Sequence, residues 1–430
     1  MFRTISNFMR VGDIRRKIIF TLLMLVVFRL GTFIPVPYTN KEAIDFMNSQ
    51  NVFGFLNTFG GGALQNFSIF AMGIMPYITA SIIMQLLQMD VVPKFAEWKK
   101  QGEMGRKKLA QITRYGTVVL AFIQAIAMSI GFNAMAQGGL ISDPSIVKFI
   151  IIALVLTSGT TFLMWLGEQI TANGVGNGIS ILIFAGIVAA VPNGVKQLYI
   201  QYFDNPGDQL FINIVIVALI VLVVIAVTVG VIFIQQALRK IPIQYAKKLV
   251  NRSPVGGHST HLPLKVNAAG VIPVIFAIAF IIAPRTVAGF FEGSDVAGTI
   301  EMIFDYTKPI GMVIYVALII AFTYFYTFVQ VNPEQMAENL QKQGGYIPGI
   351  RPGKNTETYL TRVMYRLTFV GSIFLAAVSV LPMILGGLAN LPQAVQIGGT
   401  SLLIVVGVAL QTMKQLESQL VKRHYKGFIK

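Results

Sequence analysis

The chain has 430 residues, of which 54% are hydrophobic and only 12% charged. Soluble domains average about 25% charged residues, so this composition excludes an ordinary soluble protein and indicates a membrane protein. The chain contains no cysteine, which excludes disulfides, thiol nucleophiles and cysteine metal sites. The net charge of +16 would suit a nucleic-acid partner, but the location of the charges favours another explanation, given below.

The N-terminal segment, residues 1–17, is basic, and residues 2–10 suit a short amphipathic helix on the membrane surface. The first apolar run, residues 18–37, superficially suits a signal peptide. It is too long and lacks an Ala-x-Ala-like cleavage site, so we interpret it as a retained membrane span.

Nine further charge-poor apolar windows follow, each long enough for the ~20 residues that a spanning helix needs. They lie near residues 70–89, 112–136, 146–167, 176–195, 210–236, 268–288, 308–331, 366–386 and 393–413. The predicted fold class is therefore all-α, a polytopic membrane protein with ten transmembrane helices. A very short turn, residues 170–178, joins the fourth and fifth windows.

Lysine and arginine are distributed unequally between the two sets of loops. The side shared with the N-terminus carries 28 of the 34, the opposite side carries 5, and Arg29 lies within the first window. Because cytoplasmic loops are the lysine- and arginine-rich ones, we predict that both termini are cytoplasmic.

Two of the cationic loops, residues 238–265 and 332–366, are longer than topology alone requires. The second is punctuated by glycine and proline and presents Arg351 and Lys354. Such a loop suits docking to an anionic partner, for example ribosomal RNA or an acidic protein face. The alternative is that these charges only set the topology.

The stretch 46–89 contains no charged residue and is about twice as long as one span. Three consecutive glycines, Gly60, Gly61 and Gly62, precede the span and make a good hinge. We predict a short mobile element hinged onto a broken transmembrane helix, as candidate for a pore or binding site. An ordinary external loop is the alternative.

Five spans per half would give two homologous halves of opposite orientation, a known device of membrane transport proteins. The predicted halves are residues 1–195 and 196–430. One motif recurs at equivalent places: Ala71-x-Gly73-Ile74-x-Pro76-x-Ile78 and Ala268-x-Gly270-Val271-x-Pro273-x-Ile275. Both spans are expected to line one central cavity.

Residues for bond chemistry are scarce. The three histidines, His258, His261 and His424, lie in predicted cytoplasmic segments, and no zinc-protease or Walker motif occurs. Glu168 at the end of a span and Arg29 are the ionisable residues nearest a span interior. We therefore expect no enzyme activity, no metal and no cofactor, but a passive conduit gated by apolar side chains.

Three uncharged polar residues, Gln85, Gln124 and Asn267, lie in or at the ends of three different spans. Hydrogen bonding between helices is the commoner use of such residues. A role in gating is the other interpretation.

Five segments together resemble the SecY family, the channel subunit of the bacterial Sec protein translocase. They are GGGALQNFSIFAMGIMPYITASIIMQLL (60–87), WLGEQITANGVGNGIS (165–180), HLPLKVNAAGVIP (261–273), YIPGIRPG (346–353) and GGTSLLI (398–404). The resemblance extends over essentially the whole chain.

The resemblance implies an hourglass of two inverted halves that passes unfolded polypeptides outward and releases hydrophobic segments sideways into lipid. It places the family's apolar constriction at six isoleucines: Ile74, Ile78, Ile179, Ile183, Ile275 and Ile404. It places the plug at about residues 53–66, with plug and hinge residues Phe55, Leu56, Asn57, Thr58, Phe59, Gly60, Gly61 and Gly62.

The resemblance also assigns Gln85, Gln124 and Asn267 to a lateral gate. The docking residues that we predict are Arg239, Lys240, Lys247, Lys248, Arg351 and Lys354. The implied partners are SecE-type and SecG-type small membrane subunits, the SecA motor, the ribosome, signal-bearing precursor proteins and membrane lipid. The expected location is the bacterial cell membrane. Residues 196–209 and 289–307 receive no role.

A small-solute secondary transporter with inverted repeats is the alternative function. Coupled transporters usually carry a carboxylate at mid-membrane. Its absence here, together with the all-isoleucine constriction, favours the channel.

Overall fold

The computed structural model of the chain describes residues 11–40, 60–88, 92–135, 139–141, 143–204, 210–245, 248–250, 253–255, 259–288, 295–305, 308–389 and 398–426. The predicted surface helix at residues 2–10, the plug residues Phe55–Phe59 and Lys247 lie outside these ranges.

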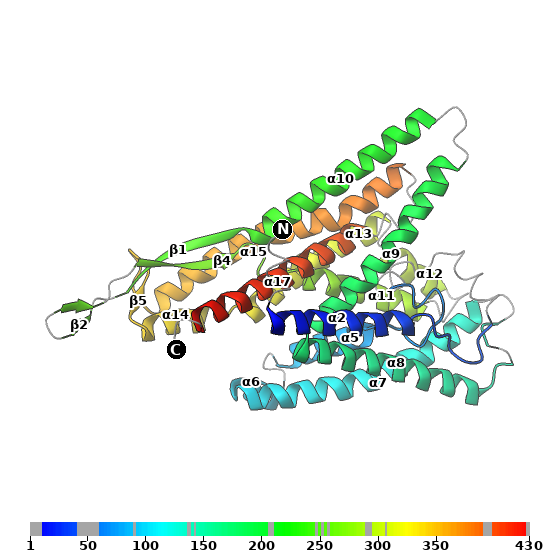
Figure 1. Cartoon of the computed structure of the whole chain (residues 1–430), viewed down its shortest axis with the longest axis horizontal. Coiled ribbons are helices and arrows are strands. Elements are labelled where there is room, and N and C mark those ends of the chain that lie inside the picture. Colours follow the sequence, from blue (N-terminus) through cyan, green and yellow to red (C-terminus); the bar gives the residue numbers. More distant parts are fainter. Residues whose placement is uncertain are drawn as a thin grey trace. The chain divides into compact units, whose positions relative to one another are not determined.

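Each of the ten predicted windows contains a helix (Figure 1). These are α2 (Gly12–Gly31), α5 (Met75–Leu86), α7 (Glu103–Met135), α8 (Ile146–Asn173), α9 (Gly178–Phe203), α10 (Leu210–Gln236), α11 (Ile272–Ala288), α13 (Pro309–Gln330), α15 (Lys354–Ala389) and α17 (Gly398–Lys426). Among the described residues, six helices are long and apolar enough to cross a membrane, namely α7, α8, α9, α10, α13 and α15. The helical membrane fold is confirmed, while the count of ten spans stays a prediction.

Three short helices connect the long ones: α6 (Pro93–Lys100), α12 (Asp295–Phe304) and α14 (Pro333–Lys342). The first span ends earlier than its apolar run, at Gly31 instead of residue 37. Pro35 and Pro37 explain the difference, because a proline has no N–H to donate and pushes the preceding residue out of the helical region. Pro35 instead forms a bridge with Ser68.

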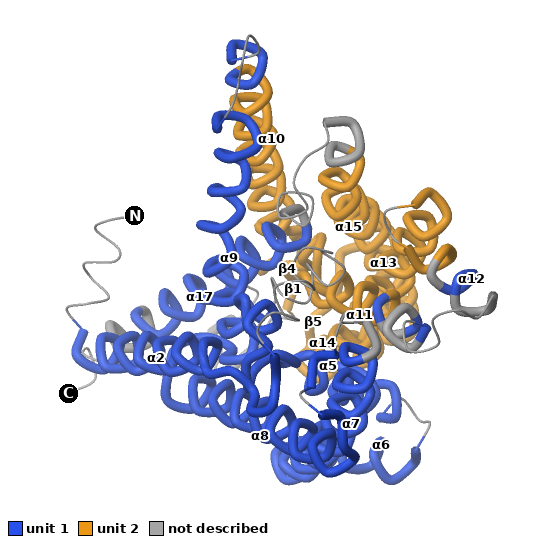
Figure 2. Tube along the Cα trace, turned by 90° about the vertical axis from the view of Figure 1, so that its right-hand side faces the viewer, with its two compact units in different colours: residues 1–214, 282–301, 385–430 blue, residues 215–281, 302–384 orange. Residues whose placement is uncertain are grey.

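The chain divides into two compact units, coloured separately in Figure 2. Unit 1 comprises residues 1–214, 282–301 and 385–430, and unit 2 comprises residues 215–281 and 302–384. Residues within each unit contact one another more than they contact the other unit. The predicted halves, residues 1–195 and 196–430, are a statement about repeats and stay a prediction.

In unit 1 the long helices α7 and α8 lie side by side, and the short helix α5 packs against both (Figure 1). Their shared core is apolar and includes the fully buried Leu140, Ile152 and Leu156. Small residues on α7, such as Ala121 and Ala125, are buried completely and let the helices approach closely.

The segment between Gly60 and helix α5 is a series of turns held between helices of unit 1. Its Phe70 ring stacks between Phe28 of α2, at 6.3 Å between ring centroids, and Phe162 of α8, at 6.0 Å. Glycine is required on both sides, because a methyl group at Gly31 would overlap the Phe70 ring and one at Gly159 would overlap the carbonyl oxygen of Ile69. The broken helix that the sequence predicts is therefore a non-helical segment packed inside protein, followed by a regular helix.

In unit 2 the two long cationic loops form a small antiparallel sheet that the sequence did not predict. Strands β1 (Leu238–Tyr245), β4 (Ser259–Lys265) and β5 (Gly345–Tyr346) pair in the order β4-β1-β5. Residue Lys240 lies opposite Pro263, and Gln244 lies opposite both Ser259 and Tyr346. Between β1 and β4 in the chain, β2 (Lys248–Val250) and β3 (Ser253–Val255) form a separate two-stranded antiparallel hairpin.

This sheet has its own apolar core. Ile241 and Ile243 of β1 and Leu264 of β4 pack with Leu340 of α14 and Leu360 of α15. Alternation along β1 leaves Lys240, Pro242 and Gln244 on the solvent face. The loops 238–265 and 332–366 are therefore one folded platform within unit 2.

Gly159→Ala should destabilise the protein by ~1–3 kcal/mol, because the added methyl group would push on a backbone carbonyl that has no room to move. The measurement is the apparent midpoint of thermal unfolding in detergent. Gly116→Ala on α7 is the matched control, since a methyl group there meets nothing within 4 Å. Equal midpoints for the two variants would contradict the tight packing of the segment against α8.

Candidate functional site

Two helix starts, one in each unit, share the same local structure. Gly73 and Gly270 adopt positive φ angles of 56° and 68°, a conformation that glycine adopts without strain. Helices α5 and α11 each begin two residues later, and in each the second helical residue is a proline. The repeated motif therefore starts both helices, because proline fits the first turn, where its missing N–H costs nothing.

The equivalence extends to the predicted constriction. Ile78 and Ile275 are each the fourth residue of their helix. The Ile78 N–H donates to the carbonyl oxygen of Ile74 at 3.1 Å, and the Ile275 N–H donates to that of Val271 at 3.4 Å. Ile74 and Val271 thus occupy matching positions just before the helices.

Five of the six predicted constriction residues, Ile74, Ile78, Ile183, Ile275 and Ile404, are buried, and Ile179 is half-buried. Ile74 and Ile78 lie one turn apart, as do Ile179 and Ile183, so each pair shares a helix face. Helix α17, which carries Ile404, packs against α9, which carries Ile179 and Ile183. Ile275 belongs to the other unit, and the ring of six stays a prediction.

The turn between α8 and α9 fixes the position of Ile179. The Asn177 side chain caps α9 by accepting from the N–H groups of Ile179 and Ser180. The Thr171 hydroxyl accepts from the Gly178 N–H at 2.8 Å, and a methyl group at Gly167 would lie 2.9 Å from Ile179 Cγ1. Glycines therefore let the two helices meet closely at the start of α9.

The three predicted lateral-gate residues have different surroundings. Gln85 donates weakly to Ser81 Oγ at 3.4 Å, and its buried Oε1 finds no partner among the described residues. Gln124 is half-buried on α7, the helix against which α5 packs. Asn267 is buried and binds the backbone of Gly270 twice, through its amide nitrogen at 3.0 Å and its oxygen at 2.9 Å.

Asn267 therefore has a local task that the sequence did not indicate: it holds Gly270 in the turn that starts α11. The gate role of the three residues stays a prediction.

The hinge glycines Gly60, Gly61 and Gly62 are described, and Gly61 and Gly62 have positive φ angles. The first two are buried within unit 1. The plug assignment for the residues before them stays a prediction.

The predicted docking residues that the structure describes belong to the platform of unit 2. Arg239 and Lys240 are exposed on β1, and Lys248 begins the β2 hairpin. Arg351 is exposed on a turn that is pinned by a hydrogen bond from Thr356 Oγ1 to its carbonyl oxygen at 3.0 Å. Lys354, also exposed, starts α15. Their role in docking stays a prediction.

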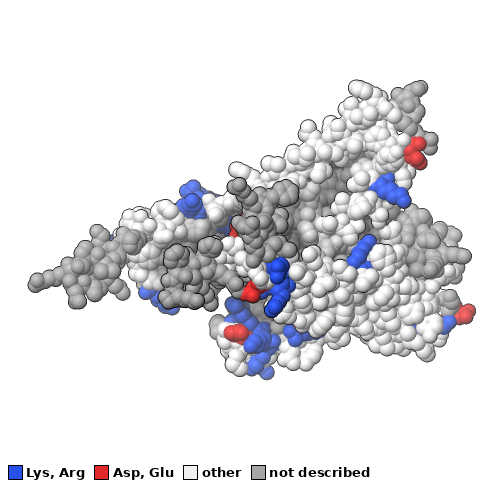
Figure 3. Space-filling view, viewed as in Figure 1, with Lys and Arg blue, Asp and Glu red and all other residues white. Residues whose placement is uncertain are grey.

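Cations also gather in unit 1. Figure 3 shows lysine and arginine side chains clustered around α6 and the first turns of α7. The exposed residues there are Lys94, Lys99, Arg106, Lys107 and Lys108. The opposite end of the α7–α8 pair carries only Asp143 and Lys148 among its described charged residues, so the asymmetry seen in the sequence is also present within this unit.

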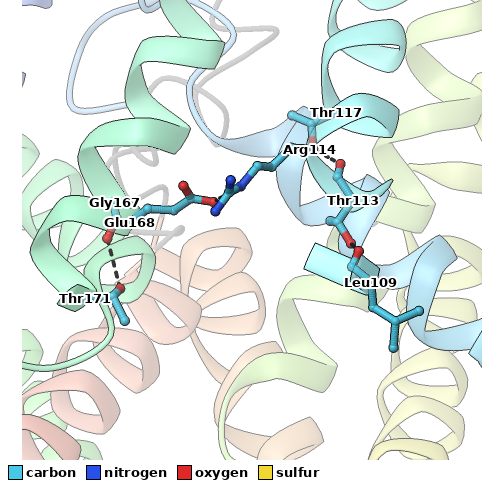
Figure 4. A network of polar contacts seen from close by, with 7 residues as sticks. All are labelled: Leu109, Thr113, Arg114, Thr117, Gly167, Glu168 and Thr171. Carbon is cyan, nitrogen blue, oxygen red and sulfur yellow. Dashed lines mark hydrogen bonds and ion pairs between the residues drawn. The ribbon is translucent and has the colours of Figure 1, made fainter. Parts of the chain in front are cut away.

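An ion pair that the sequence did not predict joins α7 to α8. Arg114 Nε lies 2.6 Å from Glu168 Oε1, and Figure 4 shows the two side chains reaching toward each other. Threonines near the pair satisfy their hydroxyls on their own helices: Thr113 donates to Leu109, Thr117 to Thr113 and Thr171 to Gly167. Arg114 lies at the start of the third predicted window and Glu168 at the end of the fourth, so both are predicted on the same side of the membrane. Their opposite charges could therefore have indicated an ion pair from the sequence.

Among the described residues, no three histidine, aspartate or glutamate side chains cluster as metal ligands would. Glu168, one of the two ionisable residues nearest a span interior, forms an ion pair with Arg114. The described residues thus include buried isoleucines on or just before helices of both units and exposed cations on α6, α7 and the platform of unit 2.

Comparison with known proteins decides the family. The family model named SecY matches residues 68–413. The chain belongs to the SecY family. It is 71% identical to the protein translocase subunit SecY of Halalkalibacterium halodurans and 70% identical to that of Bacillus subtilis, and each match covers 100% of both sequences. The corresponding subunit of Staphylococcus aureus is 56% identical, with 100% of this chain and 99% of that protein covered.

Solved structures of SecY-type channels share the fold. The match to a structure described as a protein conducting channel has a TM-score of 0.65 at 20% identity and covers 95% of this chain and 93% of that one. The match to Sec61 in a canine ribosome–channel complex has a TM-score of 0.62 at 18% identity, with 95% and 93% covered. The helical SecY-type architecture is thus present here.

Charge reversal should show how strongly Arg114 and Glu168 interact. Arg114→Glu and Glu168→Arg should each lower the apparent unfolding midpoint, and the double swap should restore part of it. The pair is partly exposed, so a coupling of ~0.2–1 kcal/mol is expected.

The same double swap of Lys107 and Glu103, an exposed pair within α7, is the reference for a pair that joins no two helices, and its coupling should not exceed ~0.3–0.5 kcal/mol. Additive effects at Arg114 and Glu168 would mean that the pair does not tie α7 to α8.

Proposed function

We propose that this chain is the protein-conducting channel of a Sec translocase, passing unfolded precursor proteins across the bacterial cell membrane. The observation that carries the proposal is the identity of 70–71% over the full length to proteins named protein translocase subunit SecY. Motion of a polypeptide through a channel needs no bond chemistry, so no catalytic residue is assigned.

The proposed constriction consists of Ile74, Ile78, Ile179, Ile183, Ile275 and Ile404. A narrow ring of aliphatic side chains expels water and so blocks ions, yet it can deform around a passing chain without binding it. The matching places of Ile78 and Ile275 at two helix starts support this assignment, because an inverted repeat would bring equivalent positions to one pore.

Sideways release follows from partition thermodynamics. A central leucine or isoleucine favours insertion by ~0.3–0.6 kcal/mol, whereas a central charge costs ~2.5–3.5 kcal/mol. A gate that opens toward lipid lets each segment of the precursor sample both phases. The proposed gate residues are Gln85, Gln124 and Asn267, and the unsatisfied Oε1 of Gln85 is a polar group that can gain a partner when the gate moves.

The proposed arrangement in the membrane is ten spans in two inverted halves, residues 1–195 and 196–430, with both termini in the cytoplasm. The cation-rich ends of α6 and α7 support this orientation, since cytoplasmic loops attract lysine and arginine. The proposed plug comprises residues 53–66, hinged at Gly60–Gly62.

The cationic platform of unit 2 is proposed to dock the SecA motor or the ribosome. A folded platform that presents Arg239, Lys240, Arg351 and Lys354 from a packed core suits a partner that applies force, because less order must be gained on binding. SecE-type and SecG-type subunits are the proposed membrane partners. The ribosome-bound channel among the solved structures supports a ribosome partner.

Ile78→Asn combined with Ile275→Asn should wet the constriction and raise the ion conductance of the resting channel in planar bilayers. Amide side chains hold water where isoleucine repels it. Ile319→Asn, at a buried position on α13 outside the proposed ring, is the control for a polar group in the core. A double variant that stays ion-tight would argue against the proposed ring.

Arg351→Glu should weaken SecA-driven transport about tenfold, because it removes one favourable contact and adds a repulsive one, each worth ~0.2–1 kcal/mol or more. The unfolding midpoint should hardly change, since the side chain is exposed. Lys308→Glu is the matched charge reversal on the proposed outer side and should leave transport unaffected. Normal transport by the Arg351 variant would refute its docking role.

Reconstitution tests the function itself. The chain is placed in proteoliposomes with SecE-type and SecG-type subunits, then supplied with SecA, ATP and a signal-bearing precursor. Protection of the precursor from added protease that requires both this chain and ATP is the expected result. Solute uptake without protection, while a known translocase works in parallel, would support the transporter instead.

A further inference from the structure

Arg29 is a charged residue in an otherwise apolar part of the first span. It lies two residues before the end of α2, and no other charge occurs between Ile18 and Gly31. A charge within a membrane span is costly and therefore indicates a function, with its partner as the first question. The channel mechanism described above assigns Arg29 no task.

The partner of Arg29 is the backbone of the hinge. Its guanidinium Nη1 donates a hydrogen bond to the carbonyl oxygen of Gly61, 32 residues further along the chain. The guanidinium carbon also lies 4.8 Å from the centre of the Phe33 ring, a cation–π contact from the same end of α2. Both contacts partly compensate the charge of the guanidinium.

Gly61 is held where only glycine fits. Its φ angle is 67°, and a methyl group there would lie 3.1 Å from Gly186 Cα on α9 and 3.5 Å from the Phe28 ring on α2. The residue is buried. Its carbonyl oxygen is therefore a fixed point to which an arginine can bind.

The segment after Gly61 is fixed to the residues that follow α2. Asn66 Nδ2 donates to the Thr32 carbonyl at 3.3 Å. The Val36 N–H donates to the Phe67 carbonyl, and the Ile69 N–H donates to the Ile34 carbonyl, each at 3.0 Å. These contacts hold residues 66–69, whereas Arg29 binds further upstream, at the hinge of the proposed plug.

We propose that Arg29 is a positioning residue that fixes the glycine hinge to α2 and thereby sets the resting seal of the channel. The inference rests on the proposed function, in which residues 53–66 form the plug and Gly60–Gly62 are its hinge. With Gly61 held, the plug is attached at a defined point of the channel wall. Without this contact the attachment point can move, and the sealed state of the channel is less stable relative to leaky states.

The test compares the resting conductance of the full channel complex in planar bilayers for the wild-type chain and a set of variants. Arg29→Leu removes both contacts, Arg29→Lys keeps the charge but not the fork of donors, and Arg29→Gln keeps a donor without the charge. Replacing residues 53–59 with a glycine–serine linker of equal length removes the plug but leaves Gly60–Gly62. Arg16→Leu, on the same helix, is the control for loss of a cation.

Arg29→Leu should raise the ratio of leaky to sealed channels about tenfold, the factor expected for a lost hydrogen bond to a charged group. Arg29→Lys and Arg29→Gln should give intermediate values, and Arg16→Leu should give the wild-type value. Arg29→Leu in the linker variant should add nothing to the leak, because Arg29 acts through the plug. A purely structural role would instead add to the leak in both backgrounds.

The two proposals fail in different ways. If the linker variant leaks and Arg29→Leu does not, or if the two effects add, the role of Arg29 is overturned while the plug stands. If the linker variant stays sealed, the plug assignment fails, and the role of Arg29 fails with it. If Arg29→Leu does not assemble with its partner subunits, Arg29→Gln and Arg29→Lys decide the same question.

Discussion

Inside a bilayer every backbone N–H and C=O must find a partner within the protein, and this constraint shapes the structure wherever the chain is not helical. The segment 60–74 meets it with turns, such as Ser68 donating to Ala63 at 2.9 Å and Gly73 donating to Phe70 at 2.8 Å. It also forms backbone hydrogen bonds with the residues that follow α2. In residues 266–271 a side chain contributes, since Asn267 binds the N–H and the carbonyl oxygen of Gly270 through its two amide atoms. A regular helix starts after each segment, and Ile78 and Ile275 lie in the first turns of these helices.

Small residues make this arrangement sterically possible. Gly31 and Gly159 leave room for the Phe70 ring between α2 and α8, and Gly167 and Gly178 let α8 and α9 meet beside Ile179. In lipid no hydrophobic force drives helices together, so close packing of this kind provides much of the attraction. Gly167 and Gly178 therefore also determine the position of the Ile179 side chain.

Charged side chains of the helices differ in their surroundings from those of the platform. Within the helices they are compensated: Glu168 by Arg114, and Arg29 by the Gly61 carbonyl and the Phe33 ring. On the platform of unit 2 they are exposed on a sheet whose other face is packed. Charges with a partner inside the protein thus hold elements in place, whereas the exposed charges of the platform remain available to another molecule.

The sequence by itself determined the membrane class, the position of every long helix and the family, because apolar windows and long motifs are local properties of the chain. It also predicted that Gly73 and Gly270 are equivalent, which their matching φ angles bear out. Only the tertiary structure decided how the two cationic loops pair into a sheet, because Gln244 and Tyr346 are 102 residues apart. It likewise decided that Arg29 binds Gly61 and that Arg114 binds Glu168, since partners distant in sequence meet only when the helices pack.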